Sequence, residues 1–296
     1  MIDLTDCEEL GNQYGGSESK RTLLYNGKIY MVKFPDPLRE QNNDLSYMNN
    51  QFSEDIGCKI FKSLGINTQN TFLAKFSDET GKSKVVVACE DFCKEGQRLL
   101  EFSKLMLADT KSKRKYKTSI ESVMEAINRI SVPINKDNLK NNFWNMMIGD
   151  ALINNGDRHL DNWGVLRTGK KLEFAPVYDC GSSLAALVSD ESMEKTILNM
   201  AEFKNDEFNV SSAYTYQGKK IFYHEIFTNP PEGLQKAILR IVPKINMKKI
   251  YNIVNNTEEM TDIRKEYLNK SLNLRHEKIL KPALEKQLKS QRKFSR

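Results

Sequence analysis

Two short polar motifs contain the residue types that phosphate chemistry requires. Asp157 to Asn162 reads D-R-H-L-D-N, and Tyr178 to Gly181 reads Y-D-C-G. The segment between them predicts a β-hairpin, which places Asp157, Asn162 and Asp179 on loops at neighbouring hairpin ends, where their side chains can converge. Phosphoryl transfer needs one carboxylate to accept the proton of a hydroxyl and oxygen ligands for a Mg²⁺ that bridges nucleotide phosphates. Either acid alone is more simply a helix terminator or a turn cap, but the two motifs together favour this chemistry.

The same chemistry needs a cation on the phosphates, and Lys33 is suitably placed. It lies near the end of a predicted strand, Y-M-V-K-F, and shares a face with Ile29 and Met31. A lysine on a strand is usually a solvated edge residue. Here Glu54 follows 21 residues later on a predicted helix and can hold the ammonium in position.

A glycine-containing segment, G-G-S-E-S-K, covers Gly15 to Lys20 and precedes the first predicted strand. Successive backbone N–H groups in such a turn can bind phosphate. Taken alone the motif is weak, and a flexible N-terminal loop is the simpler interpretation. His159, between the two acids of the first motif, could assist proton transfer, although a histidine that orients the loop is the simpler assignment.

The elements that must position these residues fall into two regions. Asn26-Gly27 separates two β-prone runs, Thr22–Tyr25 and Lys28–Phe34, and is the strongest short signal for a hairpin. A helix is predicted over residues 45–64, because apolar residues recur at helical spacing before Gly65, which suits a position just after a helix. A second antiparallel strand pair, T-F-L-A-K-F and K-V-V-V-A-C-E-D-F, follows.

From Gln97 onward the apolar period becomes helical. It predicts helices over 99–108, 119–130 and 137–154, then the hairpin, then mostly helix, with a new helix starting near Pro282. The expected fold class is α+β, with two lobes: a β-rich N-lobe over 1–93 that carries Lys33 and Glu54, and a helical C-lobe over 94–296 that carries the two polar motifs.

The ordered set of G-G-S-E-S-K, Y-M-V-K-F-P, K-I-F-K-S-L-G-I, D-R-H-L-D-N and F-A-P-V-Y-D resembles the HipA-like serine/threonine kinases. The similarity covers about Gly15 to Asp179, and A-P-V-Y-D behind D-x-x-x-x-N is its most specific element. It implies a two-lobed protein-kinase-like fold, use of ATP and Mg²⁺, and protein substrates that bear Ser or Thr.

The resemblance also implies a role for each matching residue. Asp157 becomes the catalytic base, Asn162 and Asp179 the Mg²⁺ ligands, and Lys33 the lysine on the α- and β-phosphates with Glu54 as its partner. The implied nucleotide contacts are the phosphate loop with Gly15, Gly16, Ser17 and Lys20, and the adenine hinge with Glu90, Asp91 and Phe92.

One departure from the family concerns regulation. HipA has a regulatory serine three residues before the phosphate-loop glycine, and Gln13 occupies the corresponding position here. We therefore expect any autophosphorylation on Ser17 or Ser19. The signatures of eukaryotic kinases and the Walker A motif are absent from the sequence.

Composition narrows the class of protein. The chain has 296 residues, 39% hydrophobic and 28% charged, which excludes a disordered chain. Lys and Arg exceed Asp and Glu by 45 to 39, but residues 275–296 hold eight basic and two acidic residues, so the remainder is balanced. Nucleic-acid binding is therefore not expected, and the basic C-terminal tail is a candidate contact for an acidic partner.

Five scattered cysteines without a C-x-x-C pair disfavour disulfides and structural zinc and favour a reducing compartment. No Sec-type signal or apolar stretch long enough to span a membrane is present, so we expect a cytoplasmic protein in the producing cell, with non-Sec export or nuclear targeting left open.

The expected function is an ATP- and Mg²⁺-dependent serine/threonine protein kinase. Two alternatives stay open: a phosphoinositide-kinase-like lipid kinase, whose catalytic loop also contains D-R-H-x-x-N, and a kinase-shaped binding module without activity.

Overall fold

A six-stranded sheet forms around the predicted Asn26–Gly27 hairpin in the computed structural model, which describes residues 1–11, 20–35, 49–108 and 118–294. Asn26 and Gly27 have φ of 49° and 72°, as a tight two-residue turn between twisted strands requires. They join β3 (Lys20–Tyr25) to β4 (Lys28–Lys33). The first predicted hairpin is therefore confirmed.

The other strands of this sheet come from both sides of the hairpin in sequence. They are β1 (Ile2–Asp3), β2 (Glu8–Leu10), β5 (Thr71–Ser77) and β6 (Ser83–Glu90), in the spatial order β1-β5-β6-β4-β3-β2. The β5–β6 hairpin matches the second predicted pair, and β1 is parallel to β5. A small apolar core of Leu4, Leu23, Tyr30, Val32, Ala74, Phe76, Val86 and Ala88 fills this lobe.

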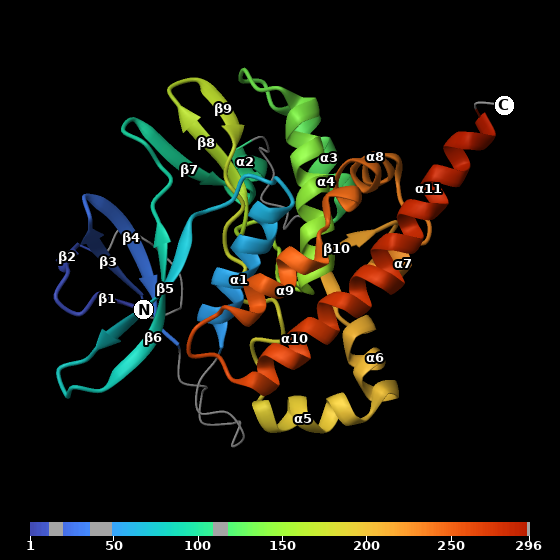
Figure 1. The fold of residues 1–296 in the computed structure, drawn as a ribbon. Helices are drawn as coiled ribbons and strands as arrows, with labels where there is room; N and C mark the ends of the chain where they lie inside the picture. Colours follow the sequence, from blue (N-terminus) through green and yellow to red (C-terminus); the bar gives the residue numbers. More distant parts are fainter. Residues whose placement is uncertain (12–19, 36–48, 109–117, 295–296) are drawn as a thin grey trace.

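Helix α1 (Asn50–Ser63) connects the sheet to the rest of the molecule (Figure 1). It ends as predicted, since Gly65 has a φ of +73°. Residues 45–48 of the predicted helix lie outside the described residues. Phe52, Ile56 and Ile60 of α1 belong to the large apolar core of the helical region, so α1 couples the two parts of the molecule.

A second, three-stranded sheet consists of β7 (Gln97–Glu101), β8 (Gly164–Thr168) and β9 (Lys171–Phe174), in that order. The helix predicted over 99–108 is wrong at its start, because residues 97–101 pair with β8 and only α2 (Phe102–Ala108) is helical. A short apolar run such as Leu99–Leu100 suits a strand or a helix, and here the open edge of β8 decides between them.

The helical region largely follows the sequence periodicity. Helix α3 (Ile120–Arg129) begins after the N-cap Ser119, and α4 (Lys136–Ile153) ends at Asn154 in the left-handed conformation. Further on lie α5 (Asp190–Leu198), α6 (Met200–Phe208), α7 (Tyr223–Ile226), α8 (Glu232–Ile241), a 3-10 turn (Val242–Lys244) and α9 (Met247–Asn255). The hairpin of β10 (Ser211–Tyr216) and β11 (Lys219–Phe222) was not predicted.

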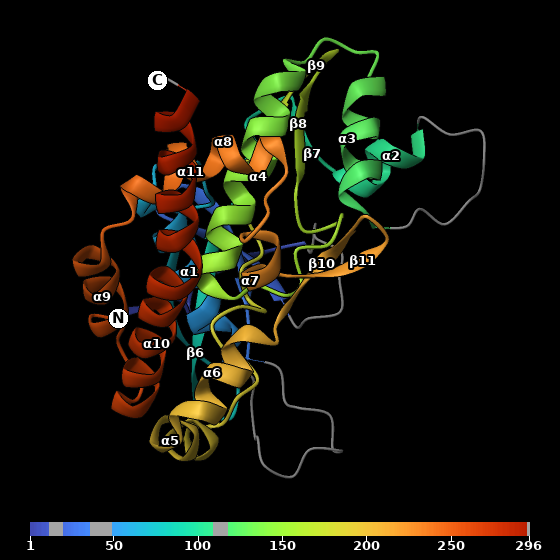
Figure 2. The same ribbon diagram turned by 90° about the vertical axis from the view of Figure 1, so that its right-hand side faces the viewer.

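The C-terminal segment forms one long rod that runs along the helical region (Figure 2) and projects beyond it at its C-terminal end (Figure 1). Helix α10 (Asp262–Arg275) continues through a π-helical turn (His276–Leu280) into α11 (Lys281–Phe294). Helix α11 begins at Lys281, next to the predicted start at Pro282, but it is not a separate helix, because the helical path continues through the π turn. Proline lacks a backbone N–H, and a local change in the helical hydrogen-bond pattern accommodates it.

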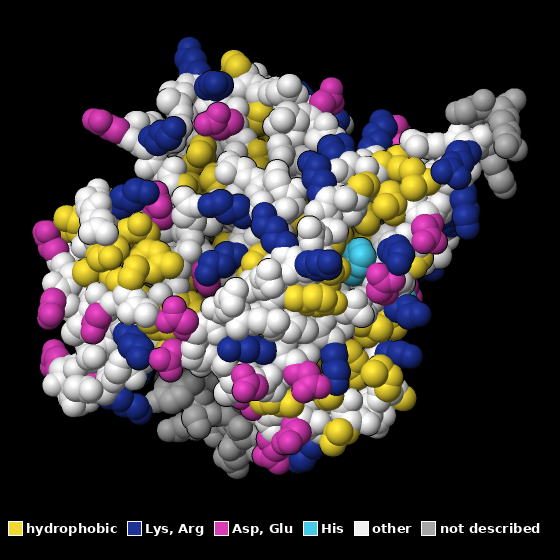
Figure 3. All heavy atoms as spheres, in the orientation of Figure 1, with side chains coloured by type: hydrophobic (Ala, Val, Ile, Leu, Met, Phe, Trp, Pro, Cys, Tyr) yellow, Lys and Arg dark blue, Asp and Glu magenta, His cyan; other side chains and the backbone are white. Residues whose placement is uncertain are grey.

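The basic tail is thus helical up to Phe294, and part of it is docked. Lys286 Nζ donates a hydrogen bond of 2.7 Å to the carbonyl of Thr228. On the visible face, acidic and basic side chains are interspersed over the body (Figure 3), in agreement with the balanced charge of residues 1–274. None of the helices that the structure describes combines the length and the apolar character needed to cross a bilayer.

The predicted α+β class is confirmed. The lobe boundary between residues 93 and 94 stays a prediction.

Candidate active site

Lys33 is the last residue of β4 and is only 6% exposed. Its ammonium lies 3.0 Å from Oε2 of Glu54 and 2.9 Å from Oδ1 of Asp179. Burying an ammonium without partners is costly, and the two carboxylates beside Lys33 offset that cost. The predicted partnership of Lys33 with Glu54 is therefore present, and the same ammonium also holds Asp179.

Glu54 is completely buried in α1, and both of its carboxylate oxygens are engaged. Oε2 contacts Lys33, and Oε1 accepts the backbone N–H of Cys180 at 3.0 Å. The thiol of Cys58, one turn later, lies 3.7 Å from Oε1. Glu54 thus ties the N-terminal sheet to the loop that carries Asp179.

Asp179 has a φ of 58°, a left-handed conformation that is unusual for a residue other than glycine. Such a backbone costs on the order of 1–2 kcal/mol. Burial acts to raise the pKa of Asp179, but the positive charge of Lys33 and its hydrogen bond outweigh this effect and lower the pKa. The side chain is therefore ionised at neutral pH and is held at a defined position.

The D-R-H-L-D-N loop follows the end of α4, where Asn154 and Asn155 turn the chain. Asn155 Oδ1 accepts the backbone N–H of Asp157, which fixes the start of the loop. Asn162 Nδ2 donates to the carbonyl of Asp157 at 2.9 Å, so the loop closes on itself. The carboxylate of Asp157 is 54% exposed and accepts the hydroxyl of Ser182 at 3.3 Å.

His159 lies between the loop acids. Its Nε2 is 3.9 Å from Oδ1 of Asp157, and its Nδ1 is 3.6 Å from Oδ2 of Asp161 and accepts the Asp161 backbone N–H. These contacts orient the ring within the loop.

Arg158 is the residue that motif analysis missed. It is 1% exposed and donates hydrogen bonds to the carboxylate of Asp150 in α4 through Nε and Nη2. Its Nη1 donates to two backbone carbonyls, those of Asn162 at 2.8 Å and of Tyr178. One guanidinium thus connects α4, the D-R-H-L-D-N loop and the Y-D-C-G loop. One signal in the sequence could have identified it: an arginine lies in the loop directly after a helix that has an aspartate, Asp150, near its C-terminal end.

The predicted adenine hinge begins where β6 ends. Glu90 is held by its neighbours: its carbonyl accepts Nε2 of Gln69 at 3.0 Å, and its carboxylate pairs with Lys28. The N–H of Asp91 donates to the carbonyl of Ile29. Within the described part of the chain, the backbone N–H and C=O of Phe92 have no such partner.

The centroids of the Phe92 and Tyr178 rings lie 5.9 Å apart, so the predicted hinge is close to the Y-D-C-G loop.

The predicted phosphate loop is described only at its end. Lys20, the first residue of β3, is the direct cross-strand partner of Lys33. The two lysines therefore share one face of the sheet. Gly15, Gly16 and Ser17 lie outside the described residues.

Comparison with known proteins agrees with this geometry. A family model described as HipA-like C-terminal domain matches residues 13–247. The chain is 37% identical over 288 residues to the serine/threonine-protein kinase CtkA of Helicobacter pylori, covering 94% of this chain and 86% of that protein.

Two solved structures are similar. The crystal structure of the Helicobacter pylori proinflammatory kinase CtkA superposes with a TM-score of 0.90 at 35% identity, covering 97% of this chain and 98% of that one. HipA of Shewanella oneidensis, solved with HipB and operator DNA, has a TM-score of 0.54 at 17% identity, covers 94% of this chain and 67% of that one, and supports the fold alone. The chain therefore belongs to the family of HipA-like serine/threonine kinases.

Proposed function

We propose that this kinase transfers the γ-phosphoryl group of ATP, in the presence of Mg²⁺, to Ser or Thr hydroxyls of a protein. The observation that carries the proposal is the position of the Lys33 ammonium between Glu54 and Asp179. Kinases need a lysine for the phosphates, a helical glutamate to hold it and a metal-binding aspartate at one place. The sequence separates the two carboxylates widely, and the fold brings them to one ammonium.

The residues present fit Mg²⁺, which prefers oxygen ligands. Asp179 offers a carboxylate, and Asn162 has its amide nitrogen engaged by the Asp157 carbonyl, which leaves its amide oxygen as the acceptor. These two residues would hold the metal, which supplies charge neutralisation on the phosphates when bound. The Lys33 ammonium, which contacts Asp179 in the structure, would also contact the phosphates when the nucleotide is bound.

Asp157 is the proposed catalytic base. Its half-exposed carboxylate can reach an incoming hydroxyl, accept its proton and orient its oxygen towards the γ-phosphorus. His159 and Ser182 support this carboxylate, since both lie close to it. In this assignment His159 positions the base and does not itself exchange a proton with the substrate.

The adenine ring is proposed to bind at Glu90–Phe92. Because Glu90 and Asp91 use backbone groups to hold Gln69 and Ile29, Phe92 provides the N–H and C=O for the base. Gly15, Gly16, Ser17 and Lys20 are proposed to cover the phosphates. Lys20 supports this placement, because it lies directly opposite Lys33 on the sheet.

Autophosphorylation on Ser17 or Ser19 is a further part of the proposal. Both serines precede Lys20 by three residues or fewer, so a hydroxyl beside the γ-phosphate would have a high effective concentration. The added charge, about −1.5 to −2, would oppose ATP binding. We expect a self-limiting modification, which mass spectrometry after incubation with ATP and a Ser17→Ala, Ser19→Ala variant can test.

The decisive assay incubates the full chain with labelled ATP and Mg²⁺, with a protein acceptor and phosphatidylinositol vesicles offered in separate reactions. Label on the protein that disappears with EDTA and with Asp157→Asn supports the proposal. Asp161→Asn is the matched control, since it changes the same charge in the same loop. Label on lipid alone would identify a lipid kinase, and no label on either, including the chain itself, would identify an inactive binding module.

A further inference from the structure

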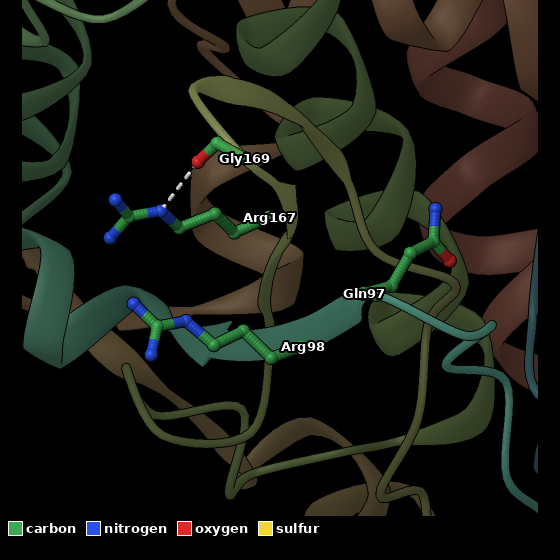
Figure 4. Close-up of a pocket in the computed structure, with 5 residues that line it drawn as sticks. Gln97, Arg98, Arg167 and Gly169 are labelled. Atoms are coloured by element: carbon green, nitrogen blue, oxygen red, sulfur yellow. Dashed lines mark hydrogen bonds between the residues drawn. The ribbon is translucent and has the colours of Figure 1, made fainter.

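Two arginines face each other at the end of the three-stranded sheet farthest from the catalytic loop. Arg98 of β7 and Arg167 of β8 are direct cross-strand partners, so their side chains lie on one face. Figure 4 shows both guanidinium groups extending to the same side of the strands. Together with Gly96, Gln97 and Gly169 they line a cavity of about 320 Å³.

The charges of this pair are not neutralised by the part of the chain that the structure describes. None of its carboxylates lies within ion-pair distance of Arg98 or Arg167, and neighbouring Glu95 and Glu173 make no such contact. Arg167 Nε donates to the carbonyl of Gly169 at 2.9 Å, which orients the group and leaves its terminal nitrogens for another acceptor (Figure 4). Like charges directly opposite one another destabilise a sheet, so the arrangement carries a cost.

The sheet face on which the pair lies is otherwise apolar. The next pair on this face is Leu100 with Val165, and Leu172 of β9 is the partner of Arg167. Val165 and Leu172 are 0% and 5% exposed, whereas both arginines are exposed. The arginines therefore extend a core-facing row past the edge of the core, where their charged ends reach solvent.

We propose that Arg98 and Arg167 form a docking site for carboxylate side chains of an acidic segment in the protein substrate. Planar guanidinium groups bind carboxylates through paired hydrogen bonds, and two of them on one face suit clustered acids. Lys94, Lys170 and Lys171 lie in or beside the adjoining turns and add positive charge.

The position of the pair relative to the catalytic loop supports a substrate contact. β8 begins two residues after Asn162, and Arg167 follows Asn162 by five residues. At about 3.3 Å per residue, five residues span at most about 16 Å, so an extended substrate segment of similar length can reach from one to the other. This inference rests on the proposed protein kinase function, and an acidic protein segment is favoured because proteins are the acceptors of that reaction.

Binding can be tested without catalysis. Fluorescence anisotropy of a labelled oligoglutamate peptide would be measured with the full chain without ATP, and oligoglutamine would be the neutral control. We expect oligoglutamate to bind and the Arg98→Gln, Arg167→Gln variant to weaken binding about tenfold. The Lys94→Gln, Lys170→Gln variant removes the same charge from the adjoining turns and should weaken binding less than about threefold, as for exposed ion pairs.

A charge reversal provides an independent check. Arg98→Glu places a carboxylate opposite Arg167, so it should abolish peptide binding while the melting temperature stays the same or rises. A lower melting temperature together with loss of binding would mean that the substitution damages the sheet. The prediction that charge reversal alone abolishes binding would then be wrong.

Three results would overturn the proposal: equal binding of oligoglutamate and oligoglutamine, equal loss in the arginine and lysine variants, or tighter and more arginine-dependent binding of a single-stranded oligonucleotide. The last result would assign the site to a nucleic acid. Label transfer from ATP, measured on the same samples, tests the proposed kinase function separately, because peptide binding requires no turnover.

Discussion

The ammonium of Lys33 lies 2.9 Å from the carboxylate of Asp179, although 146 residues separate the two in the chain. The same ammonium contacts Glu54, so a strand, a helix and a loop meet at one buried charge. Removing one member of such a group leaves the others unpaired, which makes each of them testable by substitution.

Asp179→Asn should abolish phosphoryl transfer. The amide keeps the volume of the side chain and tolerates the left-handed backbone, but it removes the charge that holds the metal. We expect a loss worth several kcal/mol of transition-state stabilisation, roughly 10²-fold or more in rate. Radiolabel transfer at increasing Mg²⁺ measures the effect. Wild-type turnover at saturating Mg²⁺ would remove Asp179 from the metal site.

Asp157→Asn should lower kcat by about 10²- to 10⁴-fold while ATP affinity changes little, because the carboxylate acts on the acceptor hydroxyl. Its side chain is half-exposed, so the fold should be unaffected. Steady-state kinetics and calorimetric titration with ATP separate the two effects. A parallel loss of ATP affinity would reassign Asp157 to nucleotide or metal binding.

Arg158→Met should destabilise the protein and disable transfer. It leaves the buried Asp150 carboxylate unpaired, which typically costs about 3–5 kcal/mol. The double variant Arg158→Met, Asp150→Asn removes both charges and should regain much of that stability in urea denaturation.

Activity should not return with stability in the double variant, because the carbonyls of Asn162 and Tyr178 still lack their shared donor. If activity returned together with stability, Arg158 would matter only for folding and not for the relative position of the two loops.

The Lys33–Asp179 pair should also make stability depend on pH. Lys33 lowers the pKa of Asp179 below its ordinary 3.8 in the folded state. The pair therefore contributes stability above the unfolded pKa, and this contribution is lost as the pH falls through the folded pKa. The free energy of unfolding of the wild type minus that of Asp179→Asn should be constant above about pH 5 and should decrease below it. A difference that increases in acid would mean that burial dominates and the pKa is raised.

Local sequence determined the features that depend on near neighbours. Asn26–Gly27 set the first hairpin, and Gly65 set the end of α1, because each residue tolerates positive φ at the turn. Residue type and order also identified Lys33, Glu54, Asp157, Asn162 and Asp179, since the chemistry limits which side chains can serve. The roles assigned to these residues stay predictions.

Tertiary structure decided the features in which one segment completes another. Residues 97–101 form a strand because they pair with the edge of β8. The β10–β11 hairpin lies in a region for which the sequence pattern predicted mostly helix. The left-handed backbone of Asp179 and the three-way contacts of Arg158 depend on groups far apart in the chain. The opposed position of Arg98 and Arg167 likewise depends on the pairing of two strands that are far apart in the chain. Sequence periodicity reports burial along one element, whereas these contacts depend on strand register and loop packing between elements, which only the folded chain defines.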